Sequence, residues 1–290
     1  MPIATHWTVR GRELSLAHPL VMGIVNVTPD SFSDGGRFLA PSAALALAAK
    51  LLAEGADIVD VGGESTRPQG ATVVSADEEL RRVLPVIRTL ATERPDVVIS
   101  VDTVKASVAE AALAAGAHIV NDVSGLRLDG EMGAVCASAG AGVIVMHSRG
   151  GITDMATYEH AEYDGDFLDE MTRELAERVD AARRAGVRSD AIAVDPGIGF
   201  SKRPEHSLRA LACLERLTAW GHPVVVGASR KRFIGHLTGE NNPSHRMFGS
   251  VGAAVTAFLR GARVLRVHDV AATRHALDVA AAIDAAGSAR

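Results

Sequence analysis

A single unit recurs along the 290-residue chain: a helical pattern, a glycine and a short apolar run. Gly55 precedes Ile58-Val-Asp-Val61, Gly116 precedes Ile119-Val-Asn-Asp122, and Gly140 precedes Val143-Ile-Val-Met146. A glycine in this place is typical of a helix that ends in the left-handed conformation before a tight turn. The runs are continuously apolar, which indicates strands covered on both faces. The sequence therefore predicts helices alternating with parallel strands.

The pattern predicts eight strands, each followed by a helix. They lie near residues 20–27, 57–62, 97–102, 117–121, 142–147, 191–195, 223–228 and 263–268. Eight successive βα units predict an α/β fold, the closed (β/α)₈ TIM barrel, with a doubly wound sheet as the alternative. We expect residues 1–290 to form a single domain in which residues 1–19 are a short N-terminal cap over the bottom of the barrel.

Composition narrows the class of protein. A hydrophobic content of 47% with 22% charged residues indicates an ordered globular chain, and the net charge of −5 argues against a nucleic-acid-binding surface. The two cysteines have no pairing pattern, which fits a reducing cytoplasm. We see no signal peptide and no apolar run near the ~18 residues of a membrane span. We therefore expect a cytoplasmic protein with no membrane partner.

Polar residues gather where the predicted strands end. They are Asn26, the run Gly62-Gly-Glu-Ser-Thr-Arg-Pro68, Asp102-Thr103, Asn121-Asp-Val-Ser124, His147, Asp195-Pro-Gly-Ile-Gly199, Gly227-Ala-Ser-Arg-Lys-Arg232 and Arg266-Val-His-Asp269. In a barrel these ends converge on one face, where barrel enzymes place their active sites. The asymmetry predicts an enzyme.

Asp102, Asn121 and Asp195 each end an apolar strand, where an unpaired polar side chain is costly. Hydrogen bonds to loop backbones, or a helix cap for Asp102, would explain any one of them. Three such residues at the same end of the barrel favour recognition of a planar polar ring, because a carboxylate accepts two parallel N–H bonds.

Lys231 is one of only four lysines in the chain and lies in Arg-Lys-Arg. It is either a solvated helix start or a charge at the barrel mouth, and Schiff-base chemistry of the aldolase kind is a further reading. Arg266 and His268 alternate along the last strand and so point the same way. With the backbone around Gly227 they could hold a phosphate or pyrophosphate.

No spacing of the zinc-binding kind is present in the sequence. Mg²⁺ is a different case, because it keeps its waters and bridges substrate phosphates through one or two protein oxygens. Asn26 could supply such an oxygen.

Seven motifs together resemble the dihydropteroate synthase family, in order from Leu20 to the last helix. They are MGIVNVTPDSFSDGG, DVGGESTRP, SVDT, NDVSG, DPGIGF, VGASRKRFIG and RVHDV. The resemblance implies a transferase of folate biosynthesis that condenses 6-hydroxymethyl-7,8-dihydropterin pyrophosphate with p-aminobenzoate. The products are 7,8-dihydropteroate and pyrophosphate, by a dissociative mechanism with Mg²⁺. We further expect a homodimer and inhibition by sulfonamides.

The resemblance also assigns residues. It implies a pterin site of Asp102, Asn121, Asp195 and Lys231, and a pyrophosphate site of Asn26, Thr66, Arg266 and His268, with the metal at Asn26. It implies a p-aminobenzoate site of Phe32, Thr66, Arg67, Pro68, Phe200 and Ser229. The catalytic residues would be Asp102, Lys231, Asp34 and Asn26, with residues 26–36 as half of a lid.

Two rival functions remain at this point. A pterin-dependent methyltransferase would share the pterin-binding acids and amide but would not need the pyrophosphate residues Arg266 and His268. A catalytically silent pterin-binding or partner-binding relative would keep the same side chains without turnover.

Overall fold

The computed structural model describes residues 4–28, 39–65 and 73–288, and within them the chain forms a barrel of eight parallel strands. The strands are β3 (Leu20–Asn26), β4 (Ile58–Gly62), β5 (Val98–Asp102), β6 (Ile119–Asp122), β7 (Gly142–Met146), β8 (Ile192–Asp195), β9 (Val225–Val226) and β10 (Val264–Val267). Their order in the sheet is β8-β7-β6-β5-β4-β3-β10-β9. A bridge between Val194 and Val224 joins the two outer strands and closes the barrel. The predicted fold class is confirmed.

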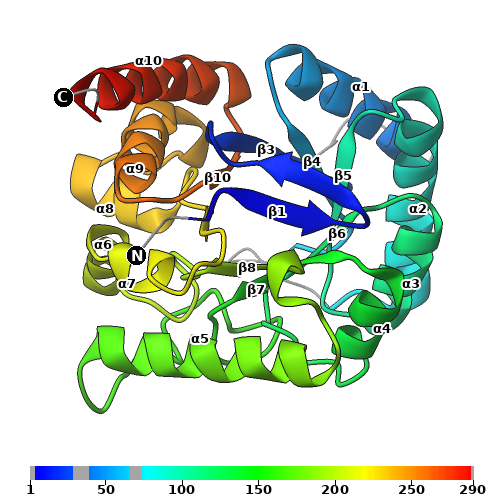
Figure 1. The fold of residues 1–290 in the computed structure, drawn as a ribbon, viewed down its shortest axis with the longest axis horizontal. Helices are drawn as coiled ribbons and strands as arrows, with labels where there is room; N and C mark the ends of the chain where they lie inside the picture. Colours follow the sequence, from blue (N-terminus) through cyan, green and yellow to red (C-terminus); the bar gives the residue numbers. More distant parts are fainter. Residues whose placement is uncertain (1–3, 29–38, 66–72, 289–290) are drawn as a thin grey trace.

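Helices surround the strands on the outside (Figure 1). They are α1 (Leu39–Ala53), α2 (Ala76–Glu93), α3 (Ala106–Ala114), α4 (Met132–Ala139), α5 (Phe167–Arg184), α6 (Pro204–Ala212), α7 (Glu215–Thr218), α8 (Arg232–Thr238), α9 (Met247–Leu259) and α10 (Val270–Ser288), with short 3-10 turns at Ser189–Ala191 and Pro243–His245. The repeated glycines mark the turns from helix to strand, as predicted. Gly116, for example, has a φ of 115°, in the left-handed region that a side chain would disfavour.

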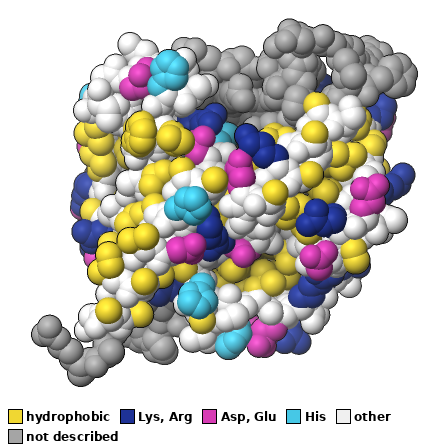
Figure 2. Space-filling view, turned by 90° about the horizontal axis from the view of Figure 1, so that it is seen from above, with side chains coloured by type: hydrophobic (Ala, Val, Ile, Leu, Met, Phe, Trp, Pro, Cys, Tyr) yellow, Lys and Arg dark blue, Asp and Glu magenta, His cyan; other side chains and the backbone are white. Residues whose placement is uncertain are grey.

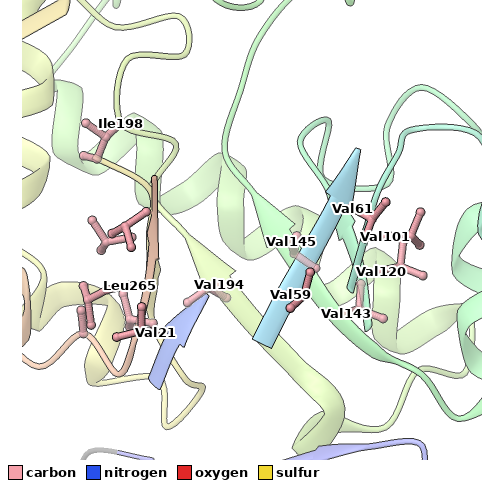
Figure 3. Close-up of a cluster of buried hydrophobic side chains, with 14 of the residues drawn as sticks. Val21, Val59, Val61, Val101, Val120, Val143, Val145, Val194, Ile198 and Leu265 are labelled. Carbon is pink, nitrogen blue, oxygen red and sulfur yellow. The ribbon is translucent and has the colours of Figure 1, made fainter. Parts of the chain in front are cut away.

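The outward faces of the strands pack against these helices. Val59 and Val61 on β4 and Val143 and Val145 on β7 belong to one large buried apolar cluster (Figure 3). Because side chains alternate along a strand, the residues between them point into the barrel. The two faces of each strand therefore have separate roles, the outer one in packing and the inner one in filling the barrel and building a site.

The bottom of the barrel interior is filled by one apolar residue from each strand. The eight residues are Met22, Ile58, Val98, Ile119, Ile144, Ala193, Val225 and Val264. They form one buried cluster with Trp7, Val9 and Leu16, which come from the N-terminal hairpin of β1 (His6–Val9) and β2 (Arg12–Ser15). The hairpin lies across the end of the barrel in Figure 1 and closes the N-terminal end of the apolar layer.

Among the described residues, no helix combines the length and the apolar character needed to cross a membrane.

We expect the hairpin to be a major contributor to stability through Trp7. Its side chain is fully buried, and its Nε1 donates to the carbonyl of Ala191 at 2.9 Å. Trp7→Ala should lower the free energy of unfolding by ~3–5 kcal/mol, since it leaves a large cavity. The measurement is the midpoint of chemical denaturation, with Trp7→Phe as control, which should lose only ~1–2 kcal/mol because most of the packing remains. Equal midpoints for wild type and Trp7→Ala would contradict this role of the hairpin.

Candidate active site

Above the apolar layer, the next inward positions of the strands are mostly polar. Two residues further along each strand than the apolar layer lie Asp60 on β4, Ser100 on β5, Asn121 on β6, Asp195 on β8 and Arg266 on β10. The strand register aligns neighbours at this end, since Asp60 lies opposite Ser100 and Asp102 lies opposite Asn121. The alternation that filled the bottom with apolar side chains thus gathers these polar groups inside the carboxyl end of the barrel.

Arg266 is at the centre of the group. Its Nε donates to Asp60 Oδ2 at 2.6 Å, and one of its terminal nitrogens donates to Asp102 Oδ2 at 2.6 Å. Asn121 Nδ2 donates to the same Asp60 oxygen at 3.1 Å. One guanidinium from the last strand therefore binds carboxylates from two other strands and fixes their positions.

Asp60 is a site residue that the sequence reading missed. Its side chain is completely buried, and its Oδ1 has no hydrogen-bond partner among the described residues. The available signal was a charge in the middle of the apolar run Ile58-Val-Asp-Val61, at an inward position of the strand. A buried carboxylate needs a cationic partner, and Arg266 supplies it.

The environment of Asp102 opposes its ionisation. Burial raises the pKa of Asp102 to about 7 although Arg266 favours the charged form, and the neighbouring Asp60 adds to the rise. A carboxyl group with such a pKa changes its charge near neutral pH and is typical of a functional site.

Asp195 and Lys231 lie at the same end of the barrel as the Arg266, Asp60, Asp102 and Asn121 cluster. Asp195 Oδ1 accepts a hydrogen bond from the backbone N–H of Gly197 at 2.6 Å, and burial raises the pKa of its carboxyl group. The ammonium of Lys231 lies 4.1 Å from the centre of the Phe200 ring and donates to the carbonyl of Ile198. Burial lowers the pKa of Lys231 to about 7, although Asp195 favours the cation.

Gly199 makes this approach of Lys231 possible. A Cβ on Gly199 would lie 3.0 Å from Cδ of Lys231, and the φ of Gly199 is +76°. A side chain would therefore both strain the backbone and displace the lysine.

Ser229 after β9 and His268 after β10 meet at the same end of the barrel. Ser229 Oγ lies 3.0 Å from His268 Nδ1 and accepts from the His268 backbone N–H at 3.2 Å. Beside them Arg230 binds Asp269 through both of its carboxylate oxygens, at 3.0 and 2.5 Å. Asp269, directly before α10, is therefore held in an ion pair.

Asn26 ends β3 and lies beside Gly62 in the sheet. A Cβ on Gly62 would lie 3.4 Å from Asp102 Cβ and 3.7 Å from Asn26 Oδ1. The absent side chain leaves Asn26 and Asp102 facing each other across the top of β4.

The described residues thus bring Asn26, Asp102, Asn121, Asp195, Lys231, Arg266, Phe200, Ser229 and His268 to one end of the barrel, as the sequence placed them. The other predicted site residues, Phe32, Asp34, Thr66, Arg67 and Pro68, lie outside the described residues.

A second buried network supports the loop that carries Phe200. Lys202 is 1% exposed, and its Nζ lies 2.7 Å from His147 Nδ1 and donates to the Phe200 carbonyl at 3.0 Å. Nε2 of the same histidine lies 3.1 Å from Glu174 Oε2. Burial lowers the pKa of both His147 and Lys202. His147 is therefore a hydrogen-bonded core residue, and Lys202 is a structural residue that the sequence reading did not single out as such.

Among the described residues, one group of side chains has a spacing that could hold a metal ion: Asp154, Glu159 and His160. Asp154 accepts from the Gly151 backbone at 2.6 Å and lies 3.3 Å from His160 Nε2. Hydrogen bonding and pairing within its own loop account for it.

Comparison with known proteins agrees with this geometry. The profile of the family described as pterin binding enzyme matches residues 22–268. The dihydropteroate synthase of Synechocystis sp. is 44% identical over 91% of this chain and 89% of its own length. The structure of Xanthomonas albilineans dihydropteroate synthase with 4-aminobenzoic acid has 47% identity and a TM-score of 0.90, covering 97% of this chain and 99% of its own.

A further similar structure is Yersinia pestis dihydropteroate synthase in complex with a sulfonamide drug. It has 42% identity and a TM-score of 0.88, covering 97% of this chain and 99% of its own. The chain therefore belongs to the pterin binding enzyme family and, within it, to the dihydropteroate synthases.

Proposed function

We propose that this protein condenses 6-hydroxymethyl-7,8-dihydropterin pyrophosphate with p-aminobenzoate to give 7,8-dihydropteroate and pyrophosphate. The observation that carries the proposal is the buried polar group around Arg266, Asp102 and Asn121 at the carboxyl end of a barrel from this family. A pterin is a planar ring with hydrogen-bond donors and acceptors along its edge. A pocket of fixed carboxylates, an amide and a cation recognises such a ring.

In the pterin site, the carboxylates of Asp102 and Asp195 accept from the ring's N–H groups. The Asn121 amide can both donate to the ring and accept from it, and Lys231 donates to a ring acceptor. Asp60 acts through Arg266 and Asn121, because its Oδ2 holds both side chains in place. The carboxylates are thereby presented in a fixed orientation, which reduces the entropic cost of binding.

The p-aminobenzoate site lies against Lys231. Phe200 and Ser229 flank the lysine, and Phe200 is already held by the cation–π contact and by Lys202. Phe32, Thr66, Arg67 and Pro68 would complete the site. Sulfonamides share the anilinic end of p-aminobenzoate, and we propose that they inhibit by occupying this position. The Yersinia pestis relative forms a complex with a sulfonamide drug.

The chemical step breaks the bond between the exocyclic methylene carbon and the pyrophosphate oxygen. The pyrophosphate leaves with the bonding electrons, and the resulting cation is delocalised into the pterin. The amine nitrogen of p-aminobenzoate then attacks the methylene carbon and releases one proton. Arg266, His268, Asn26 and Thr66 stabilise the leaving group, while Asp102 and Asp34 stabilise the cation.

Mg²⁺ fits this site as an ion that arrives with the pyrophosphate. Asn26 offers an amide oxygen at the strand end, next to the open position over Gly62. One protein oxygen suffices for Mg²⁺, because the ion keeps most of its waters and binds phosphate oxygens. When bound, the ion supplies positive charge to the departing pyrophosphate.

The alternatives fit less well. A methyltransferase has no leaving pyrophosphate for Arg266 and His268, and Schiff-base chemistry needs a carbonyl substrate for Lys231. Cys136 and Cys213 are both free thiols, which supports our proposal that the enzyme works in the cytoplasm.

We also propose that the enzyme is a homodimer through α9 and α10, which pack side by side. Large apolar side chains on these helices are exposed: Phe248 at 83%, Leu259 at 57%, Val279 at 62% and Ile283 at 69%. Hydrophobic side chains gather on the left of Figure 2, the side on which Figure 1 draws these helices. Such a patch favours association with another protein surface.

The function is tested with Asp102→Asn and Lys231→Met. Wild-type protein given the pterin pyrophosphate, p-aminobenzoate and Mg²⁺ should release pyrophosphate and form dihydropteroate. Each variant should lower turnover by at least ~10²-fold, since each removes a charge that the transition state uses. Arg184→Gln, an exposed residue at the end of α5, is the matched control. A wild type that binds the pterin without any turnover would identify a silent relative.

The same variants give a pH prediction. In the free enzyme the pKa of Asp102 is raised to about 7 and that of Lys231 is lowered to about 7. Catalysis that needs the carboxylate fails below its pKa, and catalysis that needs the ammonium fails above its pKa. The kcat/KM profile between about pH 5 and 9 should therefore be narrow, with the acid limb absent in Asp102→Asn and the alkaline limb absent in Lys231→Met. If both limbs were unchanged in both variants, neither Asp102 nor Lys231 would set the pH dependence of kcat/KM.

For the metal, Mg²⁺ should tighten pyrophosphate binding by at least about tenfold in calorimetric titrations, because it neutralises the phosphate oxygens. Asn26→Ala should lose most of that Mg²⁺-dependent gain while it keeps the Mg²⁺-independent affinity. An equal gain in Asn26→Ala would show that the amide does not hold the ion.

For the dimer, light scattering should give twice the mass of one chain for wild type. Phe248→Glu should shift the protein toward monomer, because it places a charge in an apolar interface. Leu237→Glu is the control, because Leu237 is an apolar residue on the neighbouring α8 that is 59% exposed, and this variant should stay dimeric. A monomeric wild type at about 10 μM would contradict the proposal, since interfaces of dimers are normally tighter than that.

A further inference from the structure

A cavity of about 380 Å³ lies at the N-terminal end of the barrel, on the opposite end from the polar group around Arg266. Its basic side chains are Arg10 and Arg12 of the hairpin and Arg94 at the end of α2, and His118 just before β6 lies beside them. In Figure 1 the hairpin extends toward the side of the barrel covered by α2 and α3. The cavity therefore lies between elements that the active site does not use.

Backbone carbonyls fix two of the guanidinium groups. Arg10 donates through one terminal nitrogen to the carbonyls of Leu113 and Ala117, at 2.6 and 2.9 Å. Arg12 donates to the carbonyls of Pro95 and Asp96, at 2.6 and 3.1 Å. Because a guanidinium has five N–H donors, each side chain keeps donors in reserve after these bonds.

The charges of the three arginines are not compensated. Among the described residues, no carboxylate lies within ion-pair distance of Arg10, Arg12 or Arg94, whereas Arg188 and Arg209 each pair with an acid. Burial and then the charges of Arg12 and Arg10 lower the pKa of His118 to about 4, and no acid opposes this effect. The cavity thus has a surplus of positive charge and contains a neutral imidazole.

The orientation of His118 adds a directed donor. Its Nδ1 accepts the backbone N–H of Ile99 at 3.2 Å, so the neutral ring carries its proton on Nε2. Ala91 and Val97 supply apolar wall beside these polar groups. The guanidinium groups, the neutral N–H donor of His118 and the apolar wall together suit a small organic anion.

The backbone at the hairpin turn is strained at Arg10, which indicates a specific role for this side chain. Arg10 has a φ of 47° and Gly11 a φ of 75°, a two-residue turn that favours Asn or Gly at its first position. A bulky residue in this conformation strains the backbone. The hydrogen bonds of Arg10 to backbone carbonyls offset this strain, and they hold its guanidinium on the cavity wall.

We propose that this cavity is a second binding site, for a small anion with a phosphate or carboxylate group, separate from the active site. The anion would accept from the free N–H groups of Arg10 and Arg12, from Arg94 and from His118 Nε2. Its negative charge would replace the carboxylate that these arginines lack. Because the site lies at the other end of the barrel, it is independent of the proposed reaction.

The experiment follows the ring resonances of His118 by NMR, assigned with His118→Gln, in the full-length protein. Inorganic phosphate and acetate are titrated separately, at constant ionic strength maintained with sodium chloride. The expected result is a saturable shift of the His118 signals with a dissociation constant on the order of 1 mM or tighter for one of the two anions. The pKa of His118 should rise with the bound anion, since an anion stabilises the imidazolium.

Arg94→Gln is the decisive variant, because Arg94 is exposed and its side chain makes no hydrogen bond or ion pair with the described residues that the substitution would break. It should weaken binding by at least about tenfold, the effect of one charged hydrogen bond. Arg184→Gln, outside the cavity, should bind as wild type does. A shift that grows linearly with anion concentration and does not saturate, or the same affinity in Arg94→Gln, would overturn the proposal and leave Arg10 and Arg12 as carbonyl-binding residues only. A response to phosphate alone or to acetate alone identifies the group that is recognised.

Discussion

The ion pairs of Arg266 with Asp60 and Asp102 are the interaction on which the site depends. Two carboxylates inside a barrel would repel each other and lose their hydration, so each needs a cation at hydrogen-bond distance. Arg266 reaches both because it comes from β10, which pairs with β3 next to β4. Asp60 and Asp102 precede Arg266 by 206 and 164 positions in the sequence. The closed barrel brings each carboxylate to 2.6 Å from the Arg266 guanidinium. The fold and the charge balance of the site are therefore coupled.

This arrangement carries a cost in stability that other parts of the barrel offset. Lys231 has a lowered pKa and Asp195 a raised one, which means that burial disfavours both charged forms in the absence of substrate. The apolar layer beneath them contributes in the opposite sense, and Trp7 closes that layer from below. A polar ligand that supplies hydrogen bonds to these groups recovers part of the cost, so the pocket is poised to bind a polar ring.

Much of this could be read from the sequence, for identifiable reasons. Strand positions followed from apolar runs after glycines, because both faces of each strand are covered. Strand β9 is shorter than predicted, Val225–Val226 against residues 223–228, partly because Pro223 has no N–H to donate to a neighbouring strand. Arg266 and His268 were placed together by alternation alone, as the structure has them at one end of the barrel.

What the sequence could not supply was the identity of partners far apart in the chain. Asp60 interrupts an apolar run, and only the closed barrel shows that Arg266 compensates it. Lys202 looks like a surface lysine by composition, but it is buried against His147, whose other ring nitrogen lies next to Glu174. Side chains whose environment is made by distant strands are thus the ones that sequence patterns leave undetermined.

The two ends of the barrel treat positive charge in different ways, and the difference follows from helix direction. At the carboxyl end of the strands, carboxylates from neighbouring strands pair with Arg266. At the other end, the carbonyls of Leu113 in the last turn of α3 and of Ala117 after it accept from Arg10 without neutralising its charge. The same contacts that fix the hairpin therefore leave a positive potential facing solvent, although the chain as a whole has a net charge of −5. A local surplus of this kind attracts anions, whatever evolutionary use is made of it.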